Sequence, residues 1–401
     1  MNCRSVLFVS LISATFLLTG GNVGGGSSAR AAETSASTHW VKLHEQQPTD
    51  AVRFRRQAHG GSCFDAKRGQ LILFGSDTHR QDWTNSPLLF DVATRQWRRI
   101  YANDDPATYT LNENGIPVAG LEGLHPWAMH TFGAVLCDPS RDEMIVASAP
   151  KHNTDRFKDL LPKISSFPTW TFQFGTNQWQ PLPGKAVDFF PYCAAFDSDR
   201  NVVLGYREDG IYELSGVPRS WKRLTQKTYL RGYHQNCAYD AQHQALVVFG
   251  TSRQKNDVEV YFPTNGKHQL MPTPGIRPPS DQHTPLAYHA GIGKTVVVVD
   301  RPGDGGKTVA ETWLYDLGED VWTQLPTATL PFGCGMNYNL EYDSRHNQLL
   351  LVTGEGSQPT TVWALKLQVR SEGSGVRRKN QGLFPREDLH LTPHASHLTN
   401  L

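Results

Sequence analysis

The chain has 401 residues, enough to bury a sizeable core, and it contains 38% hydrophobic residues, 10% aromatic residues, 35 Gly and 25 Pro. This composition favours many short strands and turns over long helices. The net charge is +1, which excludes a global field that would attract nucleic acid or a membrane surface, so any affinity for a charged ligand must come from local groups.

The N-terminus has the pattern of a secretory signal. Arg4 precedes the apolar run SVLFVSLISATFLLTG, and the stretch ARAA follows as an A-x-A cleavage signal. This predicts a signal peptide over residues 1–31 and a linker over residues 32–39. The apolar run is too short for a comfortable membrane span, and no second long apolar segment follows. We therefore expect a secreted or periplasmic protein with no membrane contact after the signal is removed.

A repeated unit extends over residues 40–368. The typical copy has an apolar strand that ends in Asp, or in His in the fifth copy, then a polar turn, a second apolar strand and an aromatic strand, and most copies have a closing W-x-x-L-like strand. The six copies begin with the segments HGGSCFD, HTFGAVLCD, YCAAFD, HQNCAYD, HTPLAYH and MNYNLEYD. A four-stranded antiparallel unit of about 40 to 55 residues has the size of a propeller blade. The sequence thus predicts an all-β fold, a β-propeller of six to seven blades, since the insertion between Trp97 and Trp179 leaves room for a degenerate seventh.

The two ends of the repeat region complement each other. The last copy, TVWALKL, lacks its own W-x-x-L strand, and an isolated WVKL occurs at residues 40–43. An N-terminal strand in that place would close the ring and remove a free sheet edge. The polar tail over residues 369–401 loses the strand pattern. The units resemble kelch repeats, a resemblance that implies a fold and no particular activity.

Polar pairs occur where the first two strands of several blades meet. Residues equally far from a hairpin turn face one another, so His130 and His152, which flank the turn DPSRDE, are expected together at its open end. Three other blades carry pairs at equivalent positions: His59 with His79, Tyr192 with Arg207, and His234 with Arg253. The first two strands of a blade lie nearest the propeller axis, so we expect these pairs to line one mouth of the central channel.

The chemistry of these pairs favours elimination over hydrolysis. They contain imidazole, phenol and guanidinium groups, whereas a glycoside hydrolase needs two carboxylates beside the scissile bond. An arginine can neutralise a uronate and thereby acidify its C5 proton, a histidine or tyrosine can remove that proton, and a second such group can protonate the leaving O4. The sequence therefore predicts β-elimination in an anionic, uronic acid-containing polysaccharide.

On these features the chain resembles the propeller polysaccharide lyases, in particular the ulvan lyases, which cleave a sulfated algal polymer before uronic acid residues. The resemblance implies that His130 and Tyr192 transfer protons, that Arg207 binds the carboxylate, and that His152 is a further substrate-binding or acid–base residue. Which group acts as base stays open. The other expected substrate-binding residues are His59, His79, His234, Arg253 and Trp127. Trp127 either stacks on a sugar ring or belongs to a covering insertion. We expect a monomer with no organic cofactor.

A zinc site is a separate prediction. The loop between the fourth and fifth copies contains a D-x-H pair, and a cysteine stands at the start of the sixth copy. The predicted ligands are His268, Asp281, His283 and Cys334. Imidazole, carboxylate and thiolate ligands suit a closed tetrahedral zinc site, and a structural zinc agrees with the family resemblance. The alternative is a loop of hydrogen-bonded side chains with an ordinary buried thiol. We expect Cys63, Cys193 and Cys237 to be close-packed core thiols.

Two other classes of function remain open from the sequence. A non-catalytic carbohydrate- or protein-binding propeller would keep the ring and tolerate loss of Tyr192 and His130 without losing its ligand. A propeller glycoside hydrolase would use a carboxylate pair, for which Asp188 and Glu208 are the candidates, and would form products without a new double bond.

Overall fold

The computed structural model describes residues 39–56, 58–152, 154–253, 256–279, 284–337, 339–354 and 358–367. The predicted signal peptide, most of the predicted linker and the predicted polar tail lie outside these residues. Within them, no helix is both long enough and apolar enough to cross a membrane.

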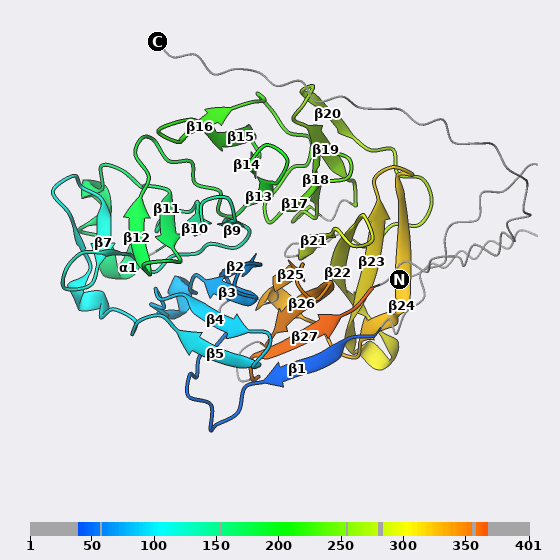
Figure 1. Ribbon diagram of the computed structural model, residues 1–401, viewed down its shortest axis with the longest axis horizontal. Coiled ribbons are helices and arrows are strands. Elements are labelled where there is room, and N and C mark those ends of the chain that lie inside the picture. Colours follow the sequence, from blue (N-terminus) through cyan, green and yellow to red (C-terminus); the bar gives the residue numbers. More distant parts are fainter. Residues whose placement is uncertain are drawn as a thin grey trace, which may run out of the picture. The chain divides into compact units, whose positions relative to one another are not determined.

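Strands dominate the described part of the chain, and they form six four-stranded antiparallel sheets (Figure 1). The first sheet contains β2 (Gly61–Asp65), β3 (Gln70–Phe74), β4 (Leu88–Asp91) and β5 (Gln96–Arg99). The second contains β9 (Val135–Asp138), β10 (Glu143–Val146), β11 (Trp170–Gln173) and β12 (Gln178–Pro181). The third contains β13 (Cys193–Asp197), β14 (Val202–Arg207), β15 (Gly210–Ser215) and β16 (Ser220–Arg223).

The remaining three sheets repeat this meander. The fourth contains β17 (Asn236–Asp240), β18 (Ala245–Phe249), β19 (Glu259–Phe262) and β20 (Lys267–Leu270). The fifth contains β21 (Leu286–His289), β22 (Lys294–Pro302), β23 (Thr308–Asp316) and β24 (Val321–Leu330). The sixth joins both ends of the described chain, because β1 (Val41–Glu45) pairs with β27 (Thr361–Leu365), which is followed inward by β26 (Gln348–Thr353) and β25 (Asn339–Asp343).

The first strands of the sheets surround a common axis. Contacts run from β2 to β9, β13, β17, β21 and β25 and back to β2, and Figure 1 shows these strands innermost. Six hydrophobic clusters each combine side chains of two neighbouring sheets. An all-β chain of four-stranded antiparallel sheets that pack face to face around an axis is consistent with a β-propeller.

Burial changes across each sheet as this packing requires. The second strand is covered on both faces by the neighbouring sheets, and every residue of β18 and β26 is buried. The outermost strands alternate instead, as in β5 and β12, where the single buried residues are Trp97 and Trp179. These tryptophans pack in clusters between sheets, which is the role that their spacing predicts.

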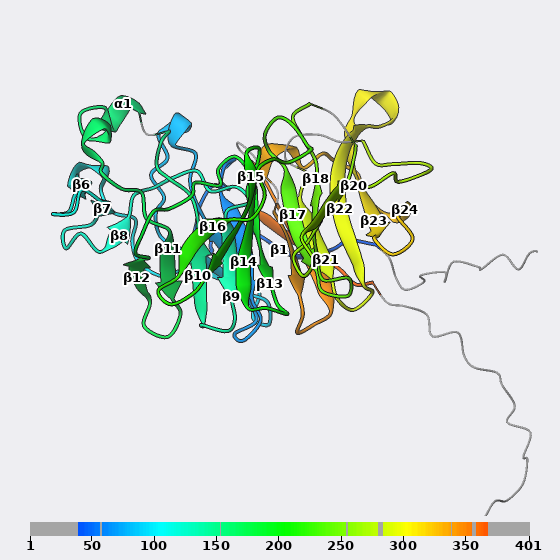
Figure 2. The ribbon, with the colours of Figure 1, turned by 90° about the horizontal axis from the view of Figure 1, so that it is seen from above.

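The insertion before β9 forms a small sheet of its own. It contains β6 (Thr110–Leu111), β7 (Pro117–Ala119) and β8 (His125–Pro126), and Figure 2 shows it outside the four-stranded sheets, on the side of β12. Since β2 contacts β9 directly, this small sheet does not lie between the first and second sheets. The short helices are η1 (Thr78–Arg80), η2 (Pro106–Thr108), α1 (Thr154–Phe157), η3 (Leu161–Lys163), η4 (Asp304–Gly306) and η5 (Gly335–Asn337).

Trp127 belongs to the core of this insertion. Its side chain is fully buried against Tyr109 and Phe157, and its indole N–H donates to the carbonyl of Val118 at 2.8 Å. The predicted stacking of Trp127 on a sugar ring is therefore wrong, because no face of the ring is open to a ligand. The covering role, which the sequence left as the alternative, agrees with its position.

Candidate functional site

The predicted polar pairs occupy equivalent positions at one edge of the sheets. One member of each pair precedes an innermost strand: His59 before β2, His130 before β9, Tyr192 before β13 and His234 before β17. The other member ends or follows the second strand: His79 in η1 after β3, His152 after β10, Arg207 at the end of β14 and Arg253 after β18. Each sheet begins with its innermost strand and continues outward as an antiparallel meander, so these positions lie at the same end of the strands, on one face of the ring.

Four of these histidines form one cluster, which we call the histidine cluster: His59, His79, His130 and His152. The ring of His130 stacks on His59 with 4.2 Å between centroids and on His152 with 4.7 Å. His79 meets His130 edge-on at 4.6 Å and His152 at 5.3 Å. Phe190 covers the cluster, with its ring 5.0 to 5.8 Å from His59, His130 and His152. Two hairpins of neighbouring sheets therefore converge on one group of imidazoles.

The backbone around Thr131 brings the two hairpins together. The buried Thr131 donates its amide to the carbonyl of His59 at 2.8 Å and its hydroxyl to the carbonyl of Phe74 at 2.7 Å, while its hydroxyl accepts from the amide of Gly61 at 2.8 Å. Gly61 permits this approach, because a Cβ there would lie 2.2 Å from the carbonyl oxygen of Phe132. These bonds fix the chain beside His59 and His130 and so set the stacked rings.

Burial keeps His59, His130 and His152 neutral. Burial lowers the pKa of His59 to about 4; Asp77 opposes this shift, and the nearby His79, His152 and Arg80 add to it. Burial and the surrounding histidines lower the pKa of His130 to about 2, and burial also lowers the pKa of His152. At neutral pH these rings carry lone pairs that can accept a proton or a metal ion.

Tyr192 and Arg207 lie together in the third sheet with acidic partners. The guanidinium lies 5.8 Å from the centre of the Tyr192 ring, and it donates to Asp209 at 3.0 Å and to the carbonyl of Asp188. The Tyr192 hydroxyl donates to Glu208 at 3.3 Å. Burial and the negative charge of Glu208 raise the pKa of Tyr192, so the phenol keeps its proton at neutral pH.

A cation-lined cavity includes Arg207 in its wall. It measures about 570 Å³, and its charged lining residues are Lys151, Lys185, Asp188, Arg207 and Arg223. The single acid among them, Asp188, is paired with Lys151 at 2.8 Å. The aromatic rings of Tyr212, Trp221 and Phe167 also line it. We call this space the cationic cavity. Neither His152 nor Tyr192 lines it, but Lys151 precedes His152 in the chain and the Arg207 guanidinium lies 5.8 Å from the centre of the Tyr192 ring.

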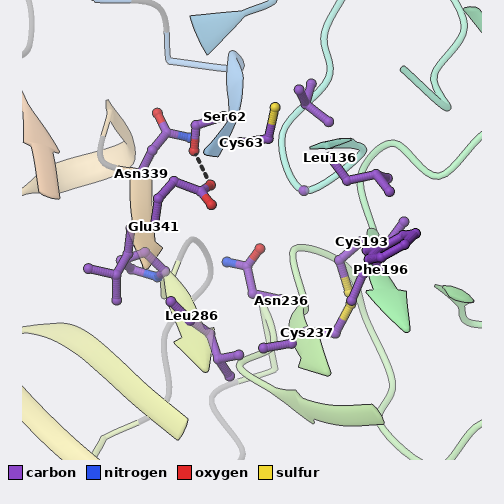
Figure 3. Close-up of a pocket in the computed structure, with 18 of the residues that line it drawn as sticks. Ser62, Cys63, Leu136, Cys193, Phe196, Asn236, Cys237, Leu286, Asn339 and Glu341 are labelled. Atoms are coloured by element: carbon purple, nitrogen blue, oxygen red, sulfur yellow. Dashed lines mark hydrogen bonds between the residues drawn. The ribbon is translucent and has the colours of Figure 1, made fainter. Parts of the chain in front are cut away.

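A second cavity occupies the axis of the ring. It measures about 290 Å³ and is lined by residues of all six innermost strands (Figure 3). Most of its wall is apolar or weakly polar, including Cys63, Cys193 and Cys237, and burial raises the pKa of the first two thiols. One carboxyl faces it, that of Glu341, which accepts a hydrogen bond from Ser62 at 2.5 Å. The thiols Cys63 and Cys193 are buried and free, as their strand positions predict.

The two remaining predicted substrate-binding residues differ in exposure, since His234 is buried and Arg253 is exposed. His234 is 8% exposed and lies with its ring 5.2 Å from Phe132 and 6.3 Å from Phe190, so it borders the histidine cluster behind these aromatic rings. Arg253 follows β18 on the same edge, and its amide bonds the Thr251 hydroxyl at 3.3 Å. The structure thus places the pairs of the first two sheets together in the histidine cluster, whereas His234 of the fourth sheet lies beside that cluster.

The described members of the predicted zinc set do not fit one ion. His268 bonds the buried carboxylate of Glu259, which also accepts from the amides of Tyr229 and Leu230. Cys334 lies in the hydrophobic cluster between the fifth and sixth sheets, and burial raises the pKa of its thiol. No contact joins these two within the described chain. The other two predicted ligands, Asp281 and His283, lie outside the described residues.

The sequence pattern missed several residues of the cationic cavity. Lys151 and Lys185 lie outside the strands, and Arg223 lies in an outermost strand, where no hairpin relation marks it. Trp221 begins a closing W-x-x-L segment and bonds Thr169 at 2.9 Å, but it is only half-buried and lines the cavity. The sequence did point to two members of the wall, Arg207 and Asp188.

Comparison with known proteins adds little to this picture. No protein-family model matches the chain, and no curated protein matches it. Among solved structures, one entitled "Structure of YjhT" is similar over 67% of this chain and 83% of that chain, with 13% sequence identity and a TM-score of 0.41. A likeness this distant carries no argument about the site, so its chemistry must be argued from the residues themselves.

Proposed function

We propose that the protein is a secreted or periplasmic, six-bladed, kelch-like propeller, closed by its N-terminal strand β1, that cleaves a uronic acid-containing anionic polysaccharide by β-elimination. A sulfated polymer of the ulvan type is the substrate class that we favour. The observation that carries the proposal is the cationic cavity, whose wall has four cations and one already paired acid, and whose Lys151 and Arg207 are respectively the chain neighbour of His152 and a contact of Tyr192.

The cavity suits an anionic sugar chain in charge and in surface. Its lysines and arginines can bind carboxylate or sulfate groups, and Arg207, which pairs with Asp209, would exchange that partner for the substrate carboxylate. Tyr212 and Trp221 also line the cavity, and aromatic rings can pack against the apolar face of a sugar. Its volume of about 570 Å³ accommodates a short stretch of polymer at a time.

The protonation states indicate which group accepts a proton and which group donates one. The half-buried His152 has a lowered pKa, so its neutral ring can take the C5 proton once Arg207 has neutralised the uronate. Tyr192 has a raised pKa, so its phenol can donate a proton to the leaving O4. His130 is only 1% exposed and cannot reach a polymer, so in this proposal the proton transfer that the resemblance gives it passes to His152.

A hydrolase is less well supported than a lyase. Its candidate carboxylates, Asp188 and Glu208, are engaged: the first is paired with Lys151 and the second accepts from the Tyr192 hydroxyl. A non-catalytic binding protein would use the same cavity, and only an activity measurement separates it from a lyase.

The test is to incubate the full chain with ulvan, pectate, alginate and glycosaminoglycans and to follow the ultraviolet absorbance of 4,5-unsaturated uronates. We expect a rise on at least one sulfated or uronate-rich polymer. Tyr192→Phe and Arg207→Ala should each reduce that rate at least about 100-fold, which is the range for loss of a proton donor or an electrostatic clamp.

Matched controls test the specificity of these losses. Tyr229→Phe removes a partly exposed hydroxyl that bonds the carbonyl of His268, and Arg98→Ala removes an exposed arginine of β5. Both should leave the rate unchanged. Absence of an absorbance rise on every polymer would exclude the lyase, and bond cleavage without such a rise would favour a hydrolase.

A further inference from the structure

We propose that His59, His79 and His130 form a binding site for one divalent transition-metal ion of the zinc class. This site differs from the zinc set that the sequence predicts, since it lies at the edge of the first and second sheets. The inference does not depend on the proposed lyase activity, because metal binding is measured without a substrate.

The geometry brings three ligand atoms to one place. One ring nitrogen from each histidine lies within 4.8 Å of the others, and within the described chain this is the only such group of three or more histidine, cysteine or acidic side chains. Three histidines with an open fourth position are a known ligand set for zinc, and imidazole nitrogen also suits nickel, copper and iron. The ligand set therefore indicates a transition metal and disfavours calcium or magnesium, which prefer oxygen.

Hydrogen bonding prepares His130 as a ligand. The Thr78 hydroxyl donates to the carbonyl of His152 at 3.3 Å, so its oxygen accepts from Nε2–H of His130 at 3.0 Å. In the tautomer that satisfies both bonds, Nε2 carries the proton and Nδ1 keeps the lone pair. A second partner that fixes the tautomer in this way is the usual companion of a metal-bound histidine.

The unsatisfied nitrogens provide independent support. Nδ1 of His59 and Nδ1 of His130 are buried, and neither has a hydrogen-bond partner within the described chain. His130 as a whole is 99% buried, as its exposed fraction is 1%. Leaving such a group unpaired costs on the order of 1 to 3 kcal/mol. Folding gains nothing by burying two unpaired nitrogens side by side, whereas a bound ion would satisfy both.

Metal binding requires a small contraction of the cluster. Bonds of about 2.0 to 2.1 Å to a tetrahedral zinc place ligand nitrogens about 3.4 Å apart, so separations of up to 4.8 Å must shorten. His79 can provide most of this movement, because it is exposed and stands on the single turn of η1, while Thr131 and Gly61 hold the chain beside the other two rings.

The surroundings suit a cation with one open position. Asp77, the residue immediately before η1, acts on His59 as a negative charge and also pairs with Arg80 at 3.3 Å, so it offsets part of the positive charge that Arg80 and the ion would bring. His152 stacks on His130 at 4.7 Å outside the group of three, and it can face the open position as a free imidazole. A bound ion would thus present a Lewis-acidic position at the edge of the ring, next to the cationic cavity.

The experiment measures binding of zinc alone. The full chain is stripped with EDTA and dialysed, then titrated with ZnCl2 by calorimetry, and the bound metal is counted by elemental analysis. We expect about one equivalent of tightly held zinc. Cobalt as a substitute should give the visible absorption of a four-coordinate centre with nitrogen ligands.

Variants locate the ion. His79→Ala should weaken zinc affinity at least about 100-fold, since even a lost outer-shell partner costs 10- to 100-fold. Its folding is expected to persist because the side chain is exposed, and circular dichroism checks this. The matched control His346→Ala removes a histidine that pairs with Asp343 elsewhere, and it should bind zinc as the parent does.

Two results would overturn the proposal. One is the absence of saturable zinc binding by the stripped parent protein. The other is a zinc affinity of His79→Ala equal to that of the parent. If zinc affinity were lost only in His268→Ala, the ion would occupy the loop between the fourth and fifth sheets. A loss confined to His79→Ala would support the histidine cluster.

Discussion

Replacing Glu341 by Gln should stabilise the protein at alkaline pH and leave it nearly unchanged at acid pH. The carboxyl of Glu341 faces the axial cavity, and burial raises its pKa from 4.5 to about 7, while the bond from Ser62 opposes the shift. A buried carboxylate without a cationic partner is the unfavourable form here, and an amide removes that charge while keeping an oxygen that accepts from Ser62.

The sign of the effect follows from proton linkage. Below pH 4.5 the carboxyl is protonated in both folded and unfolded chains, so it costs the fold nothing. Between pH 4.5 and 7 the folded chain retains a proton that the unfolded chain loses, and stability falls as the pH rises. Above pH 7 the penalty is complete. A shift from 4.5 to about 7 corresponds to about 3 kcal/mol at 1.36 kcal/mol per pKa unit.

Water in the axial cavity reduces that figure. Glu341 is only half-buried by area because it faces a space of about 290 Å³, so we expect about 1 to 3 kcal/mol. The assay is urea unfolding of the parent and of Glu341→Gln between pH 5 and pH 8.5, with the exposed Glu319→Gln as control. A stability difference between Glu341→Gln and the parent that does not change with pH would refute the reasoning.

Three further predictions test other parts of the structure. Trp127→Ala should lower the free energy of unfolding by about 3 to 5 kcal/mol in urea titrations, because removal of a fully buried indole leaves a cavity in the insertion. A decrease of less than about 1 kcal/mol would contradict the place of Trp127 in a core. The thiols of Cys63, Cys193 and Cys334, whose pKa values burial raises, should resist a disulfide reagent in the native protein and react in urea, so rapid native reaction of all three would contradict their burial. Lys185→Ala should raise KM for an anionic polymer several-fold at low salt and less at high salt, since Lys185 is exposed at the cationic cavity and salt screens such charges; a KM change that is independent of salt would remove this lysine from substrate binding.

The repeat pattern predicted the sheets well because each strand has two signals in the sequence. One is its own pattern of apolar residues, and the other is the recurrence of that pattern in the other copies. The strand that ends in Phe249, for example, is apolar throughout and recurs at the same place in every copy. The hairpin relation likewise anticipated that His130 and His152 would meet. It could not give their burial, because exposure depends on the neighbouring sheet and on Phe190, which the pairing of one hairpin does not include.

The insertion and the loops were harder to predict for the same reason. Trp127 stands beside a histidine in the sequence, but its environment comes from Tyr109 and Phe157, which are distant in the chain and follow no repeat. The sequence around His268 does not distinguish a metal ligand from a histidine that pairs with a buried carboxylate. The folded position of Glu259, which His268 bonds, shows that it is the latter. Long-range packing that lies outside a repeat leaves little trace in local patterns.

The pairing of β1 with β27 bears on how the protein is made. Val41 lies opposite Ala364, so the sixth sheet needs residues from the start and from the end of the repeat region. A nascent chain can form the earlier meanders one after another as they leave the ribosome, since their contacts are local in sequence. The last sheet must wait for release of the final strand, and until then β1 has no partner strand. Folding therefore ends with a single long-range step, and before that step the unpaired backbone of β1 is most open to pairing with another chain.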